Sequence, residues 1–138
     1  MSLKNVSMST ITKLEEVKVW LKARALAKKI YALTFVPPIS NDFRLRDQMR
    51  GSSGSTMDNI AEGFGRGSQF EAVNSYSYAK GEAEELKSQL YRCYDVGYID
   101  EAAFKELYEE TDTIVSMLFN WIKYLNECAI KGQKFKGR

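Results

Sequence analysis

The chain has 138 residues, of which 44% are hydrophobic and 28% charged, the size and composition of a single globular domain. It has no histidine and only two cysteines, Cys93 and Cys128, so a Cys/His metal site and a catalytic triad that uses histidine cannot be built. No run of 18 apolar residues could span a membrane, and the first ten residues lack the apolar core of a signal peptide. The composition therefore predicts a cytoplasmic, non-enzymatic protein with reduced thiols, no metal and no cofactor.

The first helix is expected to follow a flexible leader at residues 1–11. Thr12 and Glu15 fit a capping box, in which the two side chains satisfy free backbone donors at a helix start. Helical spacing of apolar residues follows, at Trp20, Ala23, Ala27, Ile30 and Thr34. The pair Pro37 and Pro38 is expected to end this helix.

The second helix is expected to be capped by Ser40 or Asn41. Its apolar spacing is interrupted by Gly51–Ser55, which fits a linker as well as a helix with a small-residue face, because each glycine costs about 1 kcal/mol relative to alanine in a helix. Glycines at 63, 65 and 67 are expected to close the helix by adopting the left-handed conformation.

Two further helices are predicted in the second half of the chain. Ser68 and Glu71 form a capping box for the third helix, which Gly97 is expected to stop. Asp100 is expected to cap the fourth helix, which has the clearest periodicity in the chain and should end at Lys131-Gly132, before a basic tail at residues 131–138. Short connections between the four helices predict an all-α, antiparallel up-down-up-down four-helix bundle over residues 12–130.

The charge is unevenly distributed along the chain. Residues 1–50 carry ten Lys and Arg against four acids, residues 51–100 carry four against eight, and residues 101–138 carry six of each. A basic surface attracts nucleic acid, and the planar fork of arginine suits phosphate. The candidate nucleic-acid-binding residues are Lys28, Lys29, Arg46, Arg50 and Arg66. The same residues also fit an ordinary solvated helix face with local ion pairs.

Two other features have competing interpretations. The segment Gly63–Ser68 leads into the start of a helix and could hold one phosphate. It has neither the preceding strand nor the lysine of a nucleotide-binding loop. An ordinary helix–loop–helix corner is the simpler interpretation. The many aromatic side chains of the second half could stack on unpaired bases, although a core or a subunit interface suits their helical spacing better.

Several segments resemble a family of four-helix-bundle proteins encoded in the intervening sequences of bacterial 23S rRNA genes. The resemblance begins at Lys18-Val19-Trp20, continues through Leu45–Arg50 and is strongest in the block Asn59-Ile60-Ala61-Glu62-Gly63 and the following residues to Ser68. It covers approximately residues 14–126. Where relatives often have an alanine-rich stretch and a proline before this block, the present chain has Ser52–Ser55 and Met57.

The resemblance implies a four-helix bundle that assembles as a ring-like homopentamer, and it places Gly51–Ser55 inside the second helix. It also implies a similarity in fold to the accessory protein of diversity-generating retroelements, a strongly basic protein that binds nucleic acid. The net charge of the present chain is only +2, which weakens the transfer of that activity. In the central block, we expect Asn59, Glu62 and Gly63 to be structural, with Asn59 and Glu62 joining Arg50 in a polar network.

Two main hypotheses follow. The first is a non-enzymatic homo-oligomer that binds RNA or DNA weakly through the basic candidates. The second is a protein–protein interaction scaffold with no nucleic-acid role. A third, an enzyme with an unusual Ser/Lys or carboxylate site, has little support, because most acidic residues fall on expected solvent-facing helix positions.

Overall fold

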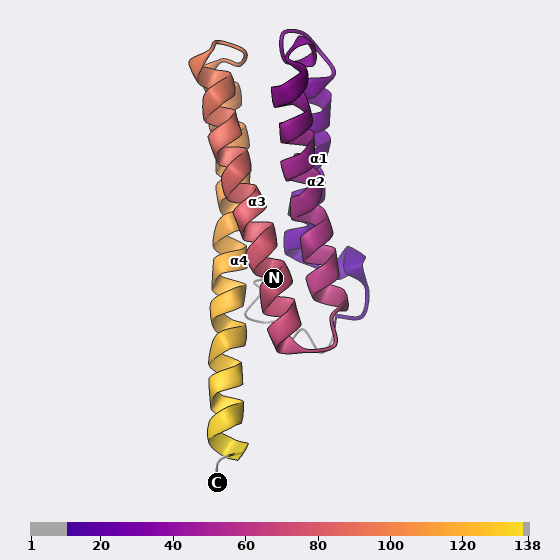
Figure 1. The fold of residues 1–138 in the computed structure, drawn as a ribbon, viewed down its shortest axis with the longest axis vertical. Helices are drawn as coiled ribbons and strands as arrows, with labels where there is room; N and C mark the ends of the chain where they lie inside the picture. Colours follow the sequence, from indigo (N-terminus) through magenta and orange to yellow (C-terminus); the bar gives the residue numbers. More distant parts are fainter. Residues whose placement is uncertain (1–10, 137–138) are drawn as a thin grey trace.

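The structure, a computed structural model, describes the backbone of residues 11–136 and the side chains of residues 11–132. Four helices, α1 (Lys18–Thr34), α2 (Phe43–Gly65), α3 (Gln69–Asp95) and α4 (Glu101–Lys136), are accompanied by short 3-10 helices at Leu14–Glu16 and Ile39–Asn41. Successive helices run in opposite directions, and each packs against its two neighbours, with α4 closing back onto α1 (Figure 1). The predicted all-α, up-down-up-down four-helix bundle is confirmed.

The core lies along the central axis of the bundle and takes one face from every helix. Its fully buried side chains are spaced three or four residues apart within each helix, as the amphipathic pattern predicts. They include Leu26, Ile30, Met49, Ile60, Leu86, Leu90, Ile114 and Leu118. The core is continuous from Val19 of α1 to Leu125 of α4.

The first helix begins later than predicted. Thr12 does not cap it: its hydroxyl contacts the Glu16 carboxylate at 3.5 Å, and Leu14–Glu16 form a separate turn of 3-10 helix. Helix α1 starts at Lys18 after Val17, whose extended backbone breaks the helical path and whose side chain is buried. The capping-box prediction was wrong because burial of Val17 determines the chain direction here more strongly than the local capping pattern does.

Helix α2 runs without interruption through Gly51–Ser55, which resolves the choice between linker and helix. Asp42, rather than Ser40 or Asn41, caps it by accepting a hydrogen bond from the Leu45 amide at 3.2 Å. Within the small-residue segment, the buried Ser53 hydroxyl donates to the carbonyl of Arg50 at 3.2 Å. The small side chains lie where α2 packs against α3, so the low helix propensity of the segment is offset by tertiary contact.

The helix ends of the second half follow local chemistry closely. The Ser68 hydroxyl accepts from the Glu71 amide at 3.2 Å, and the Asp100 carboxylate accepts from the Ala103 amide at 2.8 Å, so both predicted caps are confirmed. Helix α3 ends at Asp95 and is followed by Gly97, which has φ of +81°. The Tyr98 amide donates to the Cys93 carbonyl at 2.8 Å. This pattern is a Schellman motif, which requires a left-handed residue at the position of Gly97.

Two predicted helix ends differ from the structure. Among the described residues, Gly97 is the one residue with positive φ, so α2 ends without the left-handed glycine that we expected at positions 63–67. Helix α4 also continues past Lys131-Gly132 to Lys136, so the predicted end was wrong. A single glycine costs only about 1 kcal/mol in a helix, and no proline follows to stop it. Residues 1–10 of the expected leader and residues 137–138 of the expected tail lie outside the described residues.

Candidate functional site

The side chain of Arg50, a candidate phosphate ligand, makes its hydrogen bonds within the bundle. Its Nε donates to the Thr34 hydroxyl at 2.8 Å and its Nη2 to the Thr34 carbonyl at 3.4 Å. The guanidinium carbon lies 5.3 Å from the ring centroid of Tyr31 and 4.7 Å from that of Phe35. Because the Thr34 carbonyl is among the unsatisfied acceptors at the end of α1, Arg50 caps α1 from α2.

The other basic candidates also have partners, with one exception. Arg46 donates to Asp47 at 2.9 Å and to the Ser40 carbonyl at 3.3 Å, Arg66 pairs with Glu62, and Lys29 bonds to both Glu106 and Glu110 of α4. These two hydrogen bonds raise the pKa of Lys29. Lys28 is exposed and forms no ion pair with any residue in the described part of the chain. The candidates are therefore mostly neutralised locally.

The basic candidates do not form one patch. Arg46 and Arg50 lie near the beginning of α2, whereas Arg66 follows its last residue. At 1.5 Å per residue, Arg50 and Arg66 are separated by about 24 Å along the helix. Lys29 faces the seam between α1 and α4, where it pairs with Glu106 and Glu110.

The Asn59, Glu62 and Arg50 side chains make separate contacts rather than the expected network. The Asn59 amide donates to the Ser55 carbonyl at 2.8 Å, one turn earlier in α2, and Glu62 pairs with Arg66. Gly63 has the clearest role in this block. It is buried, and a Cβ atom built on it would lie 2.6 Å from Cε1 of Tyr76 on α3. The absence of a side chain at Gly63 thus sets how closely α3 approaches α2.

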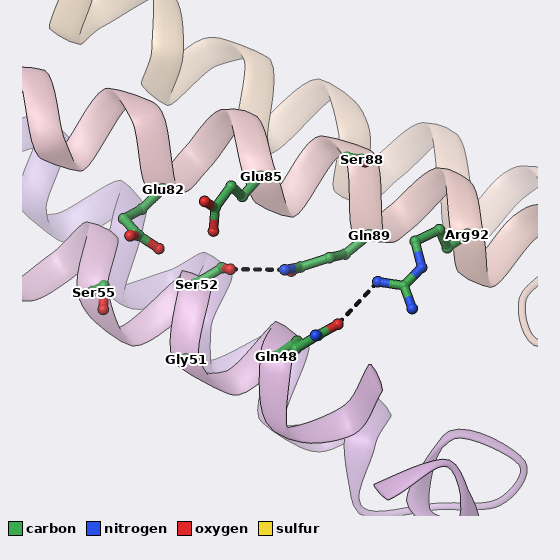
Figure 2. Close-up of a pocket in the computed structure, with 9 residues that line it drawn as sticks. All are labelled: Gln48, Gly51, Ser52, Ser55, Glu82, Glu85, Ser88, Gln89 and Arg92. Atoms are coloured by element: carbon green, nitrogen blue, oxygen red, sulfur yellow. Dashed lines mark hydrogen bonds between the residues drawn. The ribbon is translucent and has the colours of Figure 1, made fainter. Parts of the chain in front are cut away.

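A polar groove of about 520 Å³ lies between α2 and α3 (Figure 2). The wall formed by α2 consists of small and amide side chains, and the wall formed by α3 is mostly charged or polar. The α2 residues are Gln48, Gly51, Ser52 and Ser55, and the α3 residues are Glu82, Glu85, Ser88, Gln89 and Arg92. The glycine and serines of the small-residue segment leave this space open, because none of them has a long side chain to fill it.

Hydrogen bonds join the two walls at the floor and at one end of the groove. Gln89 reaches across from α3, and its Nε2 donates to the Ser52 hydroxyl at 2.9 Å (Figure 2). Nearby, Arg92 donates to Oε1 of Gln48 at 2.9 Å. At the other end, burial raises the pKa of Glu82, with further contributions from the charge of Glu85 and a hydrogen bond to it. The groove therefore has a carboxylate end and an amide–guanidinium end.

An aromatic cluster, defined by Tyr91, Tyr94, Phe104 and Tyr108, covers the seam between α3 and α4. The ring centroids of Tyr91 and Phe104 are 4.7 Å apart, those of Tyr94 and Phe104 are 5.0 Å apart, and those of Tyr91 and Tyr108 are 5.6 Å apart. Tyr91 remains 48% exposed and Tyr94 37% exposed. The rings thus contact one another while presenting apolar surface to solvent.

Among the side chains of residues 11–132, no group of three or more acidic, cysteine or histidine residues is arranged to hold a metal ion. No helix within residues 11–136 is both long and apolar enough to cross a bilayer.

Comparison with known proteins identifies the family. Residues 15–120 match the family model of the 23S rRNA-intervening sequence protein. The chain belongs to this family. No functionally curated protein matches its sequence. The sequence-based resemblance to this family is therefore confirmed.

The chain shares its fold with a solved structure, a protein with unknown function from the S23 ribosomal protein family of Bacteroides thetaiotaomicron. The two chains are 23% identical and superpose with a TM-score of 0.72, covering 77% of the present chain and 96% of the other. At this identity the similarity establishes the fold alone.

Two features of the structure were not identified as sites from the sequence. The groove was missed because the residues that join its walls are 37 and 44 positions apart in the chain. The signal in the sequence was Gly51–Ser55, which gives α2 a small-residue face. The aromatic cluster was expected only as a general excess of aromatic residues. Its members could be grouped only when the packing of α3 on α4 was known.

Proposed function

We propose that this protein is a non-catalytic helical scaffold that works by associating with further copies of itself through the aromatic cluster on α3 and α4. The observation that carries the proposal is the exposure of Tyr91 and Tyr94 within a group of touching rings. Tyrosine and phenylalanine are enriched at protein interfaces, where they bury large areas with little loss of conformational entropy. The family resemblance, which implies a ring-like homopentamer, supports the same choice of partner.

Light scattering coupled to size-exclusion chromatography tests this proposal on the full chain. We expect the unmodified protein to have the mass of an oligomer, and Tyr91→Glu to shift it to the mass of a monomer, because a buried unpaired charge opposes association. Tyr78→Glu is the matched control, since Tyr78 is on the same helix, 70% exposed and outside the cluster. A monomeric unmodified protein contradicts self-association, and an oligomer that survives Tyr91→Glu contradicts the assigned surface.

Weak binding of RNA or DNA is the second candidate function. It is supported by the basic first 50 residues and by Lys28, which forms no ion pair within the described residues. Fluorescence anisotropy with a short structured RNA, from about 50 to 200 mM salt, tests it, because phosphate binding weakens steeply over this range. We expect Lys28→Glu to weaken binding more than Arg66→Glu, since Glu62 already neutralises Arg66. Absent or salt-independent binding contradicts this function.

A further inference from the structure

The outer seam between α1 and α2 carries exposed aromatic side chains near the connection of the two helices. Phe35 is 66% exposed, Phe43 64% and Tyr31 41%. The guanidinium group of Arg50 lies over the rings of Tyr31 and Phe35. The guanidinium carbon of Arg46 is 4.9 Å from the ring centroid of Phe43. We call these five residues the arginine–aromatic surface. Exposed apolar side chains that are grouped in this way mark a site of interaction.

The arginine–aromatic surface and the aromatic cluster lie on opposite sides of the bundle, at the same end. Each helix packs against the next and α4 closes onto α1, so the α1–α2 seam is opposite the α3–α4 seam (Figure 1). Both surfaces are near the connections that join α1 to α2 and α3 to α4. The bond from Arg92 of α3 to Gln48 of α2 places Tyr91 and Arg50 at one level along the axis. A second copy in the same orientation, placed beside the first, therefore brings one surface against the other.

The surroundings of the aromatic cluster are acidic. Two lysines border the rings, and each of them interacts with two carboxylates. The members are Lys87 with Glu84 and Asp112, and Lys105 with Glu101 and Glu109. The ammonium of Lys87 is 5.2 Å from the ring centroid of Tyr108, so these charges lie directly beside the cluster. The four acids and two lysines leave an excess of negative charge here.

The surroundings of the arginine–aromatic surface are basic. Arg46 pairs with Asp47 at 2.9 Å. Lys28 is exposed and lies one helical turn before Tyr31 on α1. Neither Lys28 nor Arg50 forms an ion pair with any residue that the structure describes, so three cations accompany one paired carboxylate. The two surfaces are thus complementary in charge, and such complementarity directs protein association.

We propose that copies of this protein associate head to tail, with the aromatic cluster of one copy packed against the arginine–aromatic surface of the next. The inference rests on the self-association proposed above and names the second half of that contact. Packing one aromatic cluster against another brings like charges together and leaves the arginine–aromatic surface exposed. Packing the two different surfaces together pairs opposite charges and buries exposed rings on both sides.

Mixing variants that lack different surfaces tests this contact with the full chain. Phe35→Glu removes a ring from the arginine–aromatic surface, so both it and Tyr91→Glu should be monomeric by light scattering coupled to size-exclusion chromatography. Mixed together, the two variants should form a 1:1 complex, because each still has the surface that the other has lost. A mixture of Phe35→Glu and Phe43→Glu, which lack the same surface, should remain monomeric.

Phe70→Glu is the matched control for these variants. Phe70 is 76% exposed and lies in the first turn of α3, at the opposite end of the bundle, so this variant should keep the mass of the original oligomer. Circular dichroism melts show whether each variant is folded, as we expect at such exposed positions. Phe43→Glu takes the place of Phe35→Glu in the mixture if the latter is unfolded.

The outcomes separate this inference from self-association itself. A monomeric original protein contradicts both. If the original protein is an oligomer and Tyr91→Glu is a monomer, but Phe35→Glu and Phe43→Glu keep the full mass, self-association stands and the head-to-tail contact is overturned. Folded, monomeric single variants that form no 1:1 complex when mixed also overturn it.

The shared level of the two surfaces also predicts a charge pair across the contact. Lys29 bonds to Glu106 and Glu110, so the adjacent Lys28 and Glu109, which are both exposed, are also at one level. Lys28→Glu and Glu109→Lys should each raise the concentration needed for association by about fivefold, because each places like charges together. Both changes in one chain restore the original net charge and should restore most of the affinity. A double variant as weak as the two single changes combined overturns this placement of the copies.

Discussion

Gly63 of α2 and Tyr76 of α3 are in direct contact, with no space between them for a single methyl group. An added Cβ atom would lie 2.6 Å from Cε1 and 2.9 Å from both Cδ1 and Cζ of the tyrosine. Tyr76 is only 2% exposed, so its ring is packed among other core side chains and any shift must displace them. The contact therefore fixes the separation of the two helices at this level of the bundle.

Gly63→Ala should destabilise the protein even though alanine is the better helix former. Overpacking costs about 1–3 kcal/mol, and the gain in helix propensity is about 1 kcal/mol, so we expect the free energy of unfolding to fall by up to about 2 kcal/mol. Gly54→Ala is the control on the same helix, because its Cβ would meet nothing within 4 Å, and it should be neutral or stabilising. Urea denaturation of both variants measures the difference. A stabilised Gly63→Ala protein would contradict the close approach.

Arg50 should behave as a structural residue. Replacing it with alanine removes the bonds to Thr34 and the packing between Tyr31 and Phe35, with an expected loss of about 1–3 kcal/mol. Lysine should restore only part of this stability, because an ammonium lacks the planar fork of arginine. Arg44→Ala, at an exposed position, should stay within about 0.5 kcal/mol of the original protein. Thermal melts of the three variants test this, and equal effects at residues 44 and 50 would refute the structural role.

The two thiols should differ strongly in reactivity. Cys93 is fully buried, and burial raises its pKa to about 11, whereas Cys128 is partly exposed. Because the thiolate is the reactive form, one thiol per chain should react with Ellman's reagent in the native protein and two after unfolding. Cys128→Ser should remove the fast reaction. Rapid labelling of Cys93 in the folded protein would show that the core opens easily.

The Cys93 thiol should also make the free energy of unfolding depend on pH in the alkaline range. The folded-state pKa of about 11 is above the ordinary value of 9.0, so the folded state binds the proton more tightly than the unfolded state. This contribution is fully present below pH 9 and is lost as the pH rises toward 11, by up to about 2–3 kcal/mol. Between pH 9 and 11, the free energy of unfolding should fall less for Cys93→Ala than for the original protein. Urea denaturation at several pH values measures this difference. Identical pH dependence would contradict the shift.

Gly97→Ala should weaken the end of α3. Its φ of +81° is in the region where a Cβ atom costs about 1–2 kcal/mol, although nothing in the surroundings would clash with the added atom. Asn is the residue other than glycine that best tolerates this conformation, so Gly97→Asn should lose less. Chemical denaturation compares the two, and an unaffected alanine variant would argue against the Schellman motif.

Local chemistry was predictable from the sequence where neighbouring residues decide it. Ser68, Asp100 and Gly97 act within one turn of their own positions, so their roles could be inferred from the order of residues. Thr12 failed as a cap because the buried position of Val17 sets the path of the chain. The partner of Arg50 is 16 residues away, on another helix, and only the packing of α1 against α2 brings Thr34 within reach.

Helix α4 extends past the rest of the bundle (Figure 1). With 36 residues against the 27 of α3, it is longer by about 14 Å. A fluorophore, affinity tag or fused domain joined after this helix would begin clear of the bundle. For engineering, the last turns of α4 thus hold an attached group away from the other three helices.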